Sequence, residues 1–247
     1  MPARRPGVSG VVYGCAVRPF GVWIGIDIWC DDRLMSRPVG AYLFDQGWER
    51  ERARLSGLSA GFDPVTIRLL EDLGVGPDWS CYEVGAGSIA RWLAGRVAPH
   101  GRVMVTDLDT RFLSDLAELP GVEVRQADVM SDPFPPDAFD LIHARAVLEH
   151  LPGREQVIPA LAAGLRPGGV LLVEDTVIGG DFGRATEPMV QPRRISEAFI
   201  RVLEAVGAGF RAVGADPRVR AAATRLVDRC GADPGRCCVC FAVGHRR

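Results

Sequence analysis

The chain has 247 residues, which is enough for one α/β domain with terminal additions and a sizeable core. Hydrophobic residues make up 47% of it and charged residues 24%, a balance typical of soluble globular domains. The net charge of −2 gives no basis for strong attraction to nucleic acid or to an anionic membrane, so neither is expected as a partner.

The segment 1–40 is predicted to be an irregular or disordered extension. Arg18 and Asp27 interrupt its apolar stretch, and no uninterrupted apolar run reaches the roughly 18 residues that a membrane span needs. The seven cysteines form no short disulfide framework, which favours a reducing, cytoplasmic compartment. No metal site is expected, because the C-terminal cysteines lack a C-x-x-C pair and a histidine at ligand spacing; these are Cys237, Cys238 and Cys240.

Two helices are predicted within 41–76, before the alternating core of the chain begins. The first is a charged helix at 45–60. The second begins at Asp63 and Pro64, which supply an N-cap and a first-turn proline, and it ends at Gly74.

Short apolar runs alternate with helical segments through 77–176. Strands are predicted at 81–84, 103–106, 122–125, 141–144 and 170–174. Helices are predicted near 88–97, 110–118 and 154–165. This alternation predicts a Rossmann-like, doubly wound α/β fold, with a mostly parallel sheet and helices on both faces. The carboxyl ends of its strands share one edge, where ligands bind.

The last part of the chain, 177–247, is predicted to form a connection on the substrate side and a C-terminal addition to the domain. The Gly/Pro-rich stretch 176–192 indicates a long connection over the carboxyl edge of the sheet. Helices near 193–206 and 217–229 and one strand at 237–243 are predicted to follow.

A glycine-rich turn, E-V-G-A-G-S at 83–88, follows the first predicted strand. Glycines allow the backbone to turn tightly and to approach a ligand, and the next helix presents free amides to an anionic group. The pattern is weak on its own, since G-x-G-x-x-A also matches the dinucleotide fingerprint.

Acidic residues follow the second and third predicted strands. Asp107 lies 20 residues beyond Gly87, the distance expected for an acid that accepts both ribose hydroxyls of a nucleoside. Helix capping is the alternative role for Asp107, and Asp109 suits capping and ligand contact equally well. Asp128, just past the third strand, is placed to accept a hydrogen bond from an adenine amino group.

Four motifs, taken together and in order, resemble the class I S-adenosylmethionine-dependent methyltransferases, particularly the small-molecule enzymes of bacterial quinone and secondary metabolism. They are E-V-G-A-G at 83–87, A-D-V at 127–129, F-D-L-I-H-A-R-A-V-L-E-H-L at 139–151 and L-R-P-G-G-V-L-L-V-E-D at 165–175. The resemblance covers 40–176. It implies S-adenosyl-L-methionine as the cofactor and methyl transfer to a small-molecule acceptor.

The resemblance also implies a set of cofactor-binding residues along the ends of the first four strands. Those near the methionine portion would be Glu83, Gly85, Ala86 and Gly87. Those near the nucleoside would be Asp107, Leu108, Asp128 and Val129. Those beneath the sulfonium would be Ala144 and Arg145. The N-terminal helices would form a lid that carries Tyr42, Trp48 and Arg52.

The chain departs from the family pattern at two places. Ile89 stands at the third glycine position, so the loop is shorter by about two residues. Only the strand at 237–243 is available for the antiparallel strand pair that closes the family's sheet, so that pair is expected to be incomplete.

Two other functions stay open because of the shortened loop and the ambiguous glycine pattern. One is a degenerate binding module that keeps the fold but has lost cofactor affinity. The other is an NAD-type oxidoreductase, which the Asp128 motif and the L-E-H motif at 148–150 disfavour. A chain without lysine also has no Tyr-x-x-x-Lys pair, which one common dehydrogenase site requires.

Methyl transfer from a sulfonium is an in-line displacement that needs a general base only when the acceptor must lose a proton. His143 and His150 lie in the right region and are the candidate catalytic residues, with capping or packing as their alternative role. The family resemblance implies that the N-terminal segment and the connection at 176–215 select the acceptor. Arg193 and Arg194 would suit an acidic acceptor, although a solvated helix start is the favoured interpretation. A homodimer stays open.

Overall fold

A computed structural model describes residues 51–85, 87–133, 135–175, 207–215 and 238–241 of the chain. The helices are α1 (Glu51–Asp72), α2 (Ser88–Val97) and α3 (Arg154–Ala163), with a further helical segment at 207–212. The strands are β1 (Ser80–Val84), β2 (Arg102–Asp107), β3 (Val122–Gln126), β4 (Phe139–Arg145), β5 (Leu165–Glu174) and β6 (Cys238–Phe241). The 3₁₀ turns are η2 (Thr110–Phe112), η3 (Ser114–Leu116) and η4 (Leu148–His150).

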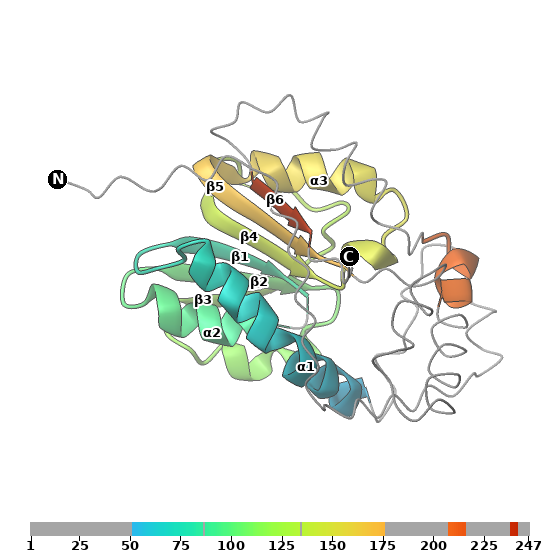
Figure 1. Cartoon of the computed structure of the whole chain (residues 1–247), viewed down its shortest axis with the longest axis horizontal. Coiled ribbons are helices and arrows are strands. Elements are labelled where there is room, and N and C mark those ends of the chain that lie inside the picture. The colour runs from blue at the N-terminus through green and yellow to red at the C-terminus, as the bar shows by residue number, and fades with distance from the viewer. Residues whose placement is uncertain (1–50, 86, 134, 176–206, 216–237, 242–247) are drawn as a thin grey trace.

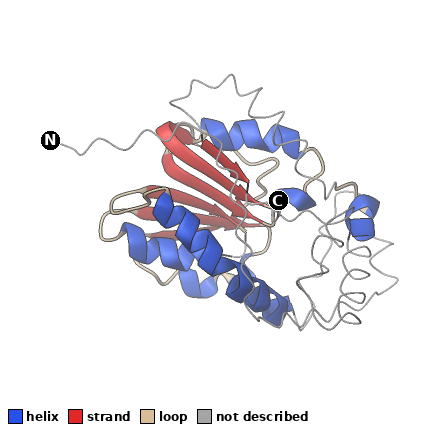
Figure 2. Cartoon of the chain, viewed as in Figure 1, coloured by secondary structure: helices blue, strands red, loops and turns tan. Residues whose placement is uncertain are grey.

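The described strands form one parallel sheet in the order β3-β2-β1-β4-β5-β6. The chain first builds outward from β1 to β3 and then continues on the other side of β1 with β4. The strand order therefore reverses between β1 and β4, and a ligand crevice is expected at the carboxyl ends of these strands. The predicted doubly wound α/β fold is confirmed (Figure 2).

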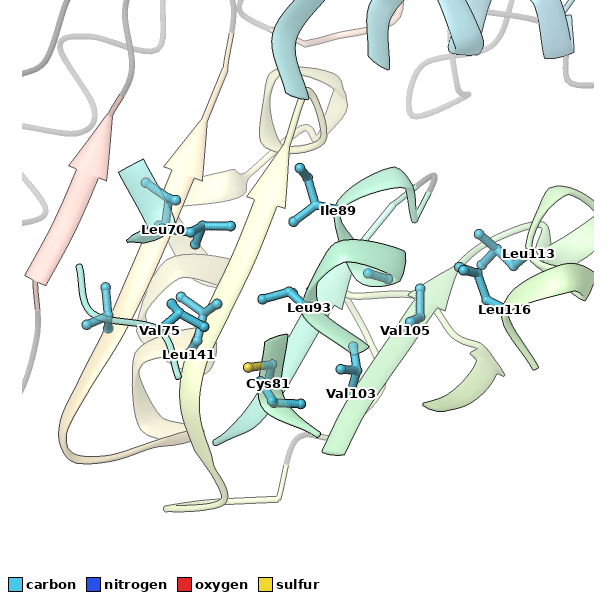
Figure 3. Close-up of a cluster of buried hydrophobic side chains, with 14 residues drawn as sticks. Leu70, Val75, Cys81, Ile89, Leu93, Val103, Val105, Leu113, Leu116 and Leu141 are labelled. Carbon is cyan, nitrogen blue, oxygen red and sulfur yellow. The ribbon is translucent and has the colours of Figure 1, made fainter. Parts of the chain in front are cut away.

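Helices cover both faces of the sheet: α1 and α2 lie on one face and α3 on the other (Figure 1). Strand alternation explains the two cores, because successive side chains point to opposite faces. Leu141 of β4 is buried against α1 and α2, whereas its neighbour Ile142 is buried on the side of α3. Figure 3 shows the first core, in which Leu70 of α1 and Leu93 of α2 lie among side chains of the strands.

The five predicted core strands and the helices at 88–97 and 154–165 are confirmed, with ends that differ by a few residues. The helix predicted at 110–118 is wrong, because the chain forms η2 and η3 there instead. Leu113 and Leu116 are the buried residues of this segment, and their spacing of three matches the period of a 3₁₀ helix.

The predicted break at Asp63 and Pro64 is also wrong, because α1 runs through Pro64 without interruption. An internal proline removes one helical hydrogen bond and crowds the preceding turn. Thr66 and Leu70 follow the proline on the inner face of α1 and are fully buried, and this packing stabilises the helix on the C-terminal side of Pro64. The predicted end of the helix is confirmed, since α1 stops at Asp72 and Gly74 has a left-handed φ of 78°.

The C-terminal strand predicted at 237–243 is confirmed as β6, which pairs in parallel with β5. An antiparallel closing pair does not occur among the strands that the structure describes. Several predicted segments lie outside the described residues: the extension 1–40, the connection 176–192, and the helices 193–206 and 217–229. In the part of the chain that is described, no helix is long and apolar enough to cross a membrane.

Candidate functional site

The carboxyl ends of β1, β2, β4 and β5 meet at one edge of the sheet, where their arrowheads point in Figure 1. This edge brings together the glycine turn after β1, Asp107 at the end of β2, Arg145 at the end of β4 and Glu174 at the end of β5. Parallel strands require this juxtaposition, since every strand delivers its last residue to the same side. Most of the predicted site residues therefore share one region of the molecule.

The turn after β1 uses glycine where a side chain would not fit. Gly85 has a φ of 112° and its amide donates to the carbonyl oxygen of Thr106 at 2.8 Å. A Cβ at Gly85 would lie 3.0 Å from Cγ2 of Val147, so the backbone here is already closely covered. Gly87 caps the N-terminus of α2 with a φ of 76° and no side-chain hydrogen bond. Ala86 lies outside the described residues.

We expect Gly87→Ala to destabilise the domain by about 1–3 kcal/mol. The new Cβ would lie 2.6 Å from Cδ1 of Leu116 and 2.8 Å from Cδ2 of Leu113, and the positive φ adds backbone strain. Urea unfolding measures the loss. Gly95→Ala in the same helix is the matched control, because a Cβ there meets nothing within 4 Å and alanine favours the helix by about 0.5–1 kcal/mol. Equal stability of the two variants would contradict the packing described for Gly87.

Asp107 is half-buried at the tip of β2, and its Oδ1 accepts from the amide of Asp109 at 3.0 Å. The next residue, Leu108, is 52% exposed and presents an apolar side chain beside this carboxylate. Asp109 caps η2, because its carboxylate accepts from the amide of Arg111 and pairs with the Arg111 guanidinium at 2.6 Å. Of the two roles predicted for Asp109, the structure describes the cap.

Asp128 lies in a tight turn after β3. Its Oδ1 accepts from the amide of Met130 at 2.8 Å, and its Oδ2 accepts from the hydroxyl of Ser131 at 3.2 Å. Asp128 and Val129 also line a cavity of about 240 Å³ on the α3 face of the sheet, together with Tyr82, Met104, Thr106, Arg125, Ala127, Asp132, Pro133 and Pro135. Each carboxylate oxygen keeps a second lone pair, so these turn bonds leave room for one more donor.

Glu83, His143 and Glu174 form a buried ionic trio across β1, β4 and β5. Nδ1 of His143 lies 2.6 Å from a Glu83 oxygen, and Nε2 lies 2.9 Å from a Glu174 oxygen. The imidazole is fully buried. Burial alone would lower its pKa, but the charge of Glu83 and the hydrogen bonds to both carboxylates raise the pKa of His143 to about 9. His143 is therefore cationic at neutral pH and has both ring nitrogens bonded to the protein.

We expect the free energy of unfolding to fall by about 3 kcal/mol as the pH rises from 6.5 to above 9. The pKa of His143 is about 9 in the folded chain against 6.5 for an ordinary histidine. The stabilisation is therefore complete below pH 6.5 and is lost through pH 9. Urea unfolding across this range measures it. The same series on His143→Gln should lose most of the slope, and an unchanged slope would contradict a protonated ring.

Arg145 ties the end of β4 to α1 and α2. Its guanidinium donates to Asp63 at 2.5 Å, to the Thr66 hydroxyl at 2.9 Å and to the Ser88 hydroxyl at 3.0 Å. The Ser88 hydroxyl in turn donates to Asp63 at 3.0 Å. Asp63 therefore serves as an ion-pair partner in this cluster. Ala144, the other residue predicted beneath the sulfonium, is fully buried in the core on the α3 side.

His150 has different surroundings from His143. Its ring packs 4.7 Å from the Phe210 ring, centroid to centroid, and only 8% of the residue is exposed. Burial, with a smaller effect from the charge of Arg54, lowers the pKa of His150 to about 3. The ring is therefore neutral at ordinary pH and is a weak proton acceptor.

Asp175 is a buried acid directly after β5 that the sequence interpretation did not identify. Its Oδ1 accepts from the amide of Val147 at 3.2 Å, while its Oδ2 has no hydrogen-bond partner within the described ranges. Burial, partly offset by hydrogen bonds from backbone amides and by the charge of Arg154, raises the pKa of Asp175 to about 7. Asp175 therefore fixes the turn that carries Val147 over Gly85.

The lid residues are placed only in part. Tyr42 and Trp48 lie outside the described residues, as do Arg193 and Arg194. Arg52 is exposed on α1, and its guanidinium carbon lies 5.0 Å from the centre of the Phe112 ring in η2. This contact links α1 to the segment after Asp107. Over the described ranges, no group of three or more His, Cys, Asp or Glu side chains is arranged to hold a metal ion.

Glu174 belongs to the site but was absent from the predicted set. The sequence pattern could have indicated it, because Glu174 lies two residues after the buried Leu172 and therefore on the same face of its strand. His143 follows Leu141, and Glu83 follows Cys81, in the same way. Three charged residues at core-facing positions of three predicted strands indicate a buried ionic cluster. Asp63, Thr66 and Ser88 gave no comparable signal, since only the docking of α1 brings them to Arg145.

Comparison with known proteins identifies the domain. Residues 82–173 match the family described as "Methyltransferase domain". The "Methyltransferase str3" of Strobilurus tenacellus is 30% identical over 165 residues, which cover 66% of this chain and 56% of that protein. A "Trans-aconitate 2-methyltransferase" of Paracidovorax citrulli (strain AAC00-1) is 39% identical over 105 residues, which cover 42% of this chain and 36% of that protein. A crystal structure of a "SAM dependent methyltransferase" from Aquifex aeolicus is 19% identical, with a TM-score of 0.42, over 55% of this chain and 77% of that one.

Residues 82–173 are therefore similar to a methyltransferase domain, and the parallel sheet with its glycine turn has the Rossmann-like α/β fold. The match spans little more than half the length of the fungal relative, 56%.

Proposed function

We propose that the chain is an S-adenosylmethionine-dependent methyltransferase that acts on a small-molecule acceptor. One observation carries the proposal: in a methyltransferase domain, the Gly85–Gly87 turn and the Asp107 carboxylate lie at the carboxyl ends of the adjacent strands β1 and β2. This is the place where an open α/β sheet binds a nucleoside ligand.

The nucleoside half of the cofactor fits the residues present. Asp107 is partly exposed at the strand end, and each of its carboxylate oxygens has two lone pairs, so the group can accept from ribose hydroxyls beside its bonds to the protein. Leu108 offers an exposed apolar side chain to an adenine ring, and Val129 lines the nearby cavity with Asp128. We propose that Asp107 holds the ribose and that Leu108, Asp128 and Val129 surround the base.

The methionine half of the cofactor would lie beside side chains that already bond to other protein groups. Glu83 is 4% exposed and bonded to His143, and Arg145 is bonded to Asp63, Thr66 and Ser88. The tail of the cofactor would therefore share these side chains with their protein partners. We propose that Glu83 accepts from the ammonium group beside the Gly85–Gly87 turn, with Ala144 and Arg145 beneath the sulfonium.

The cofactor, when bound, supplies an activated methyl group on a sulfonium. The chain's own residues would hold the two reactants in line and exclude water, which is the main requirement of a displacement. Neither candidate histidine is suited to act as a general base. His143 is enclosed by carboxylates, and the low pKa of His150, about 3, makes it a poor acceptor of a substrate proton at neutral pH. We therefore propose an acceptor that attacks without losing a proton to either histidine.

The small-molecule acceptor class draws support from the relatives. The trans-aconitate 2-methyltransferase is named for a small-molecule substrate, and its similarity covers 42% of this chain. Selection of the acceptor is proposed to lie with the N-terminal segment and with 176–215, most of which falls outside the described residues.

Titration calorimetry of the full chain with S-adenosylmethionine, S-adenosylhomocysteine and NAD tests the function. We expect binding of the first two and none of NAD. Binding of NAD alone would overturn the proposal in favour of an oxidoreductase.

A degenerate binding module is the second candidate, and one observation favours it. The space over the glycine turn is closely covered by Val147, and the nearby Arg145 is already paired with Asp63. A module of this kind would bind neither S-adenosylmethionine nor its product. The same titration therefore separates the two candidates.

A further inference from the structure

Glu83, His143 and Glu174 place three ionisable side chains in the interior of the sheet. The side chains are 5%, 0% and 7% exposed, and they stand on three adjacent strands. Two residues earlier, on the same face of each strand, the chain places Cys81, Leu141 and Leu172, all fully buried. The trio is thus a polar layer between an apolar core and the carboxyl edge of the sheet.

The charges within this layer do not cancel. The groups that face His143 are the carboxylates of Glu83 and Glu174, and two carboxylates on one imidazolium leave a single net negative charge. Glu174 also contacts the Thr66 hydroxyl of α1 and feels the charge of Arg145. Burial would raise the pKa of Glu174, yet the hydrogen bond and charge of His143 hold it below its usual value. The ionised form of the Glu174 carboxylate therefore depends on the proton of His143.

We propose that His143 is a positioning residue of the cofactor site, which fixes the Glu83 carboxylate at the end of β1 and sets the negative charge it presents to the ammonium group of a bound amino-acid tail. This inference rests on the proposed function, and it adds a residue that contacts no reactant. His143 donates to Glu83 at 2.6 Å, a short charge-assisted bond that allows the carboxylate one orientation. Glu83 lies two residues before Gly85, so its orientation bears directly on the glycine turn.

Loss of the imidazolium would leave two carboxylates on opposite sides of β4 in a buried layer. Glu83 would lose the donor that fixes its direction, and no cation would stand between it and the Glu174 carboxylate. An ammonium group would then meet a weaker and less ordered acceptor. The affinity for a ligand without an ammonium group would not change.

The test compares two nucleosides on the full chain by titration calorimetry at pH 7.5. S-adenosylhomocysteine carries the amino-acid tail, and 5′-methylthioadenosine lacks it. We expect His143→Gln to weaken binding of S-adenosylhomocysteine by about 10-fold or more, the value of one hydrogen bond to a charged group, and to change methylthioadenosine by less than about 3-fold. Leu172→Met is the matched control, because Leu172 is the strand partner of His143 in β5, and this volume-conserving change should alter neither affinity.

Each other outcome overturns the inference, and the cause can be identified. If His143→Gln weakens both nucleosides equally, His143 acts only through the fold. If the wild-type chain binds neither nucleoside, the proposed function fails and the inference fails with it. A second readout needs no ligand: ¹⁵N signals of histidine-labelled protein should show a protonated ring at pH 7.5 that is absent from His143→Gln. A neutral ring at that pH would also overturn the proposal.

Discussion

Replacing Asp107 with alanine is expected to weaken binding of S-adenosylhomocysteine by about 100-fold, because each hydrogen bond to a charged group contributes about 1.5–3 kcal/mol. The carboxylate stands half-buried at the end of β2, beside the glycine turn and the exposed Leu108. Alanine would remove the carboxylate that is proposed to accept from the ribose. Titration calorimetry with the purified variant measures the loss.

Two matched variants separate ligand contact from local folding. Asp107→Asn keeps a side-chain oxygen that can accept from the Asp109 amide, so the turn survives while the negative charge is lost. Asp109→Ala removes the neighbouring acid, whose carboxylate is occupied by Arg111. We expect an intermediate loss of affinity for Asp107→Asn and little change for Asp109→Ala. An equal loss in both alanine variants would show that the turn, and not the ribose contact, governs binding.

Leu141→Ala is expected to reduce the free energy of unfolding by about 2–5 kcal/mol, the range for large-to-small changes in a well-packed core. Leu141 is fully buried in β4, beneath α1 and α2, and it pairs in register with Cys81 of β1 and Val170 of β5 (Figure 3). The cavity would open below the ionic trio, where three strands and two helices meet. Urea unfolding followed by circular dichroism measures the change.

Leu108→Ala is the control for this prediction, since Leu108 is 52% exposed and its truncation should cost less than about 0.5 kcal/mol. Leu108 is also a proposed neighbour of the adenine ring, so the same variant should bind S-adenosylhomocysteine more weakly at nearly unchanged stability. A loss of stability similar to that of Leu141→Ala would contradict the exposure of Leu108. Unchanged affinity would remove Leu108 from the proposed site.

The strands were predictable because each is a short apolar run with a clear end. β4 is an example: the run at 141–144 is flanked by the polar Arg145 and by the turn before Phe139, and the structure extends it by only a few residues. The carboxyl edge then followed from topology, which placed Asp107 and Arg145 at the same side without knowledge of any side chain. The local pattern was sufficient to predict the strands and their shared edge, because buried apolar runs mark the strands and a parallel sheet places all their carboxyl ends on one side.

The helix boundaries failed where tertiary contacts outweigh local preference. Pro64 is a sequence signal for a helix start, yet α1 passes through it because Thr66 and Leu70 are buried against the rest of the domain. The segment 110–118 has helix-compatible residues, yet Leu113 and Leu116 are buried three residues apart and the chain winds as 3₁₀ turns. Neither outcome can be read from propensities, because the propensities of ordinary residues differ by less than the free energy of burying one leucine, and even the cost of an internal proline, about 3 kcal/mol, is comparable to it.

The fold class, the position of the glycine turn and the acids at the strand ends could all be predicted from the sequence, because hydrophobic period and turn residues are local properties of the chain. The bonding partners of those groups became known only from the packing of the folded chain. His143 lies between Glu83 and Glu174, and Arg145 reaches Asp63 across 82 positions of the chain. Charges far apart in sequence meet only when strands and helices pack, and burial then changes the pKa of each group according to its new neighbours.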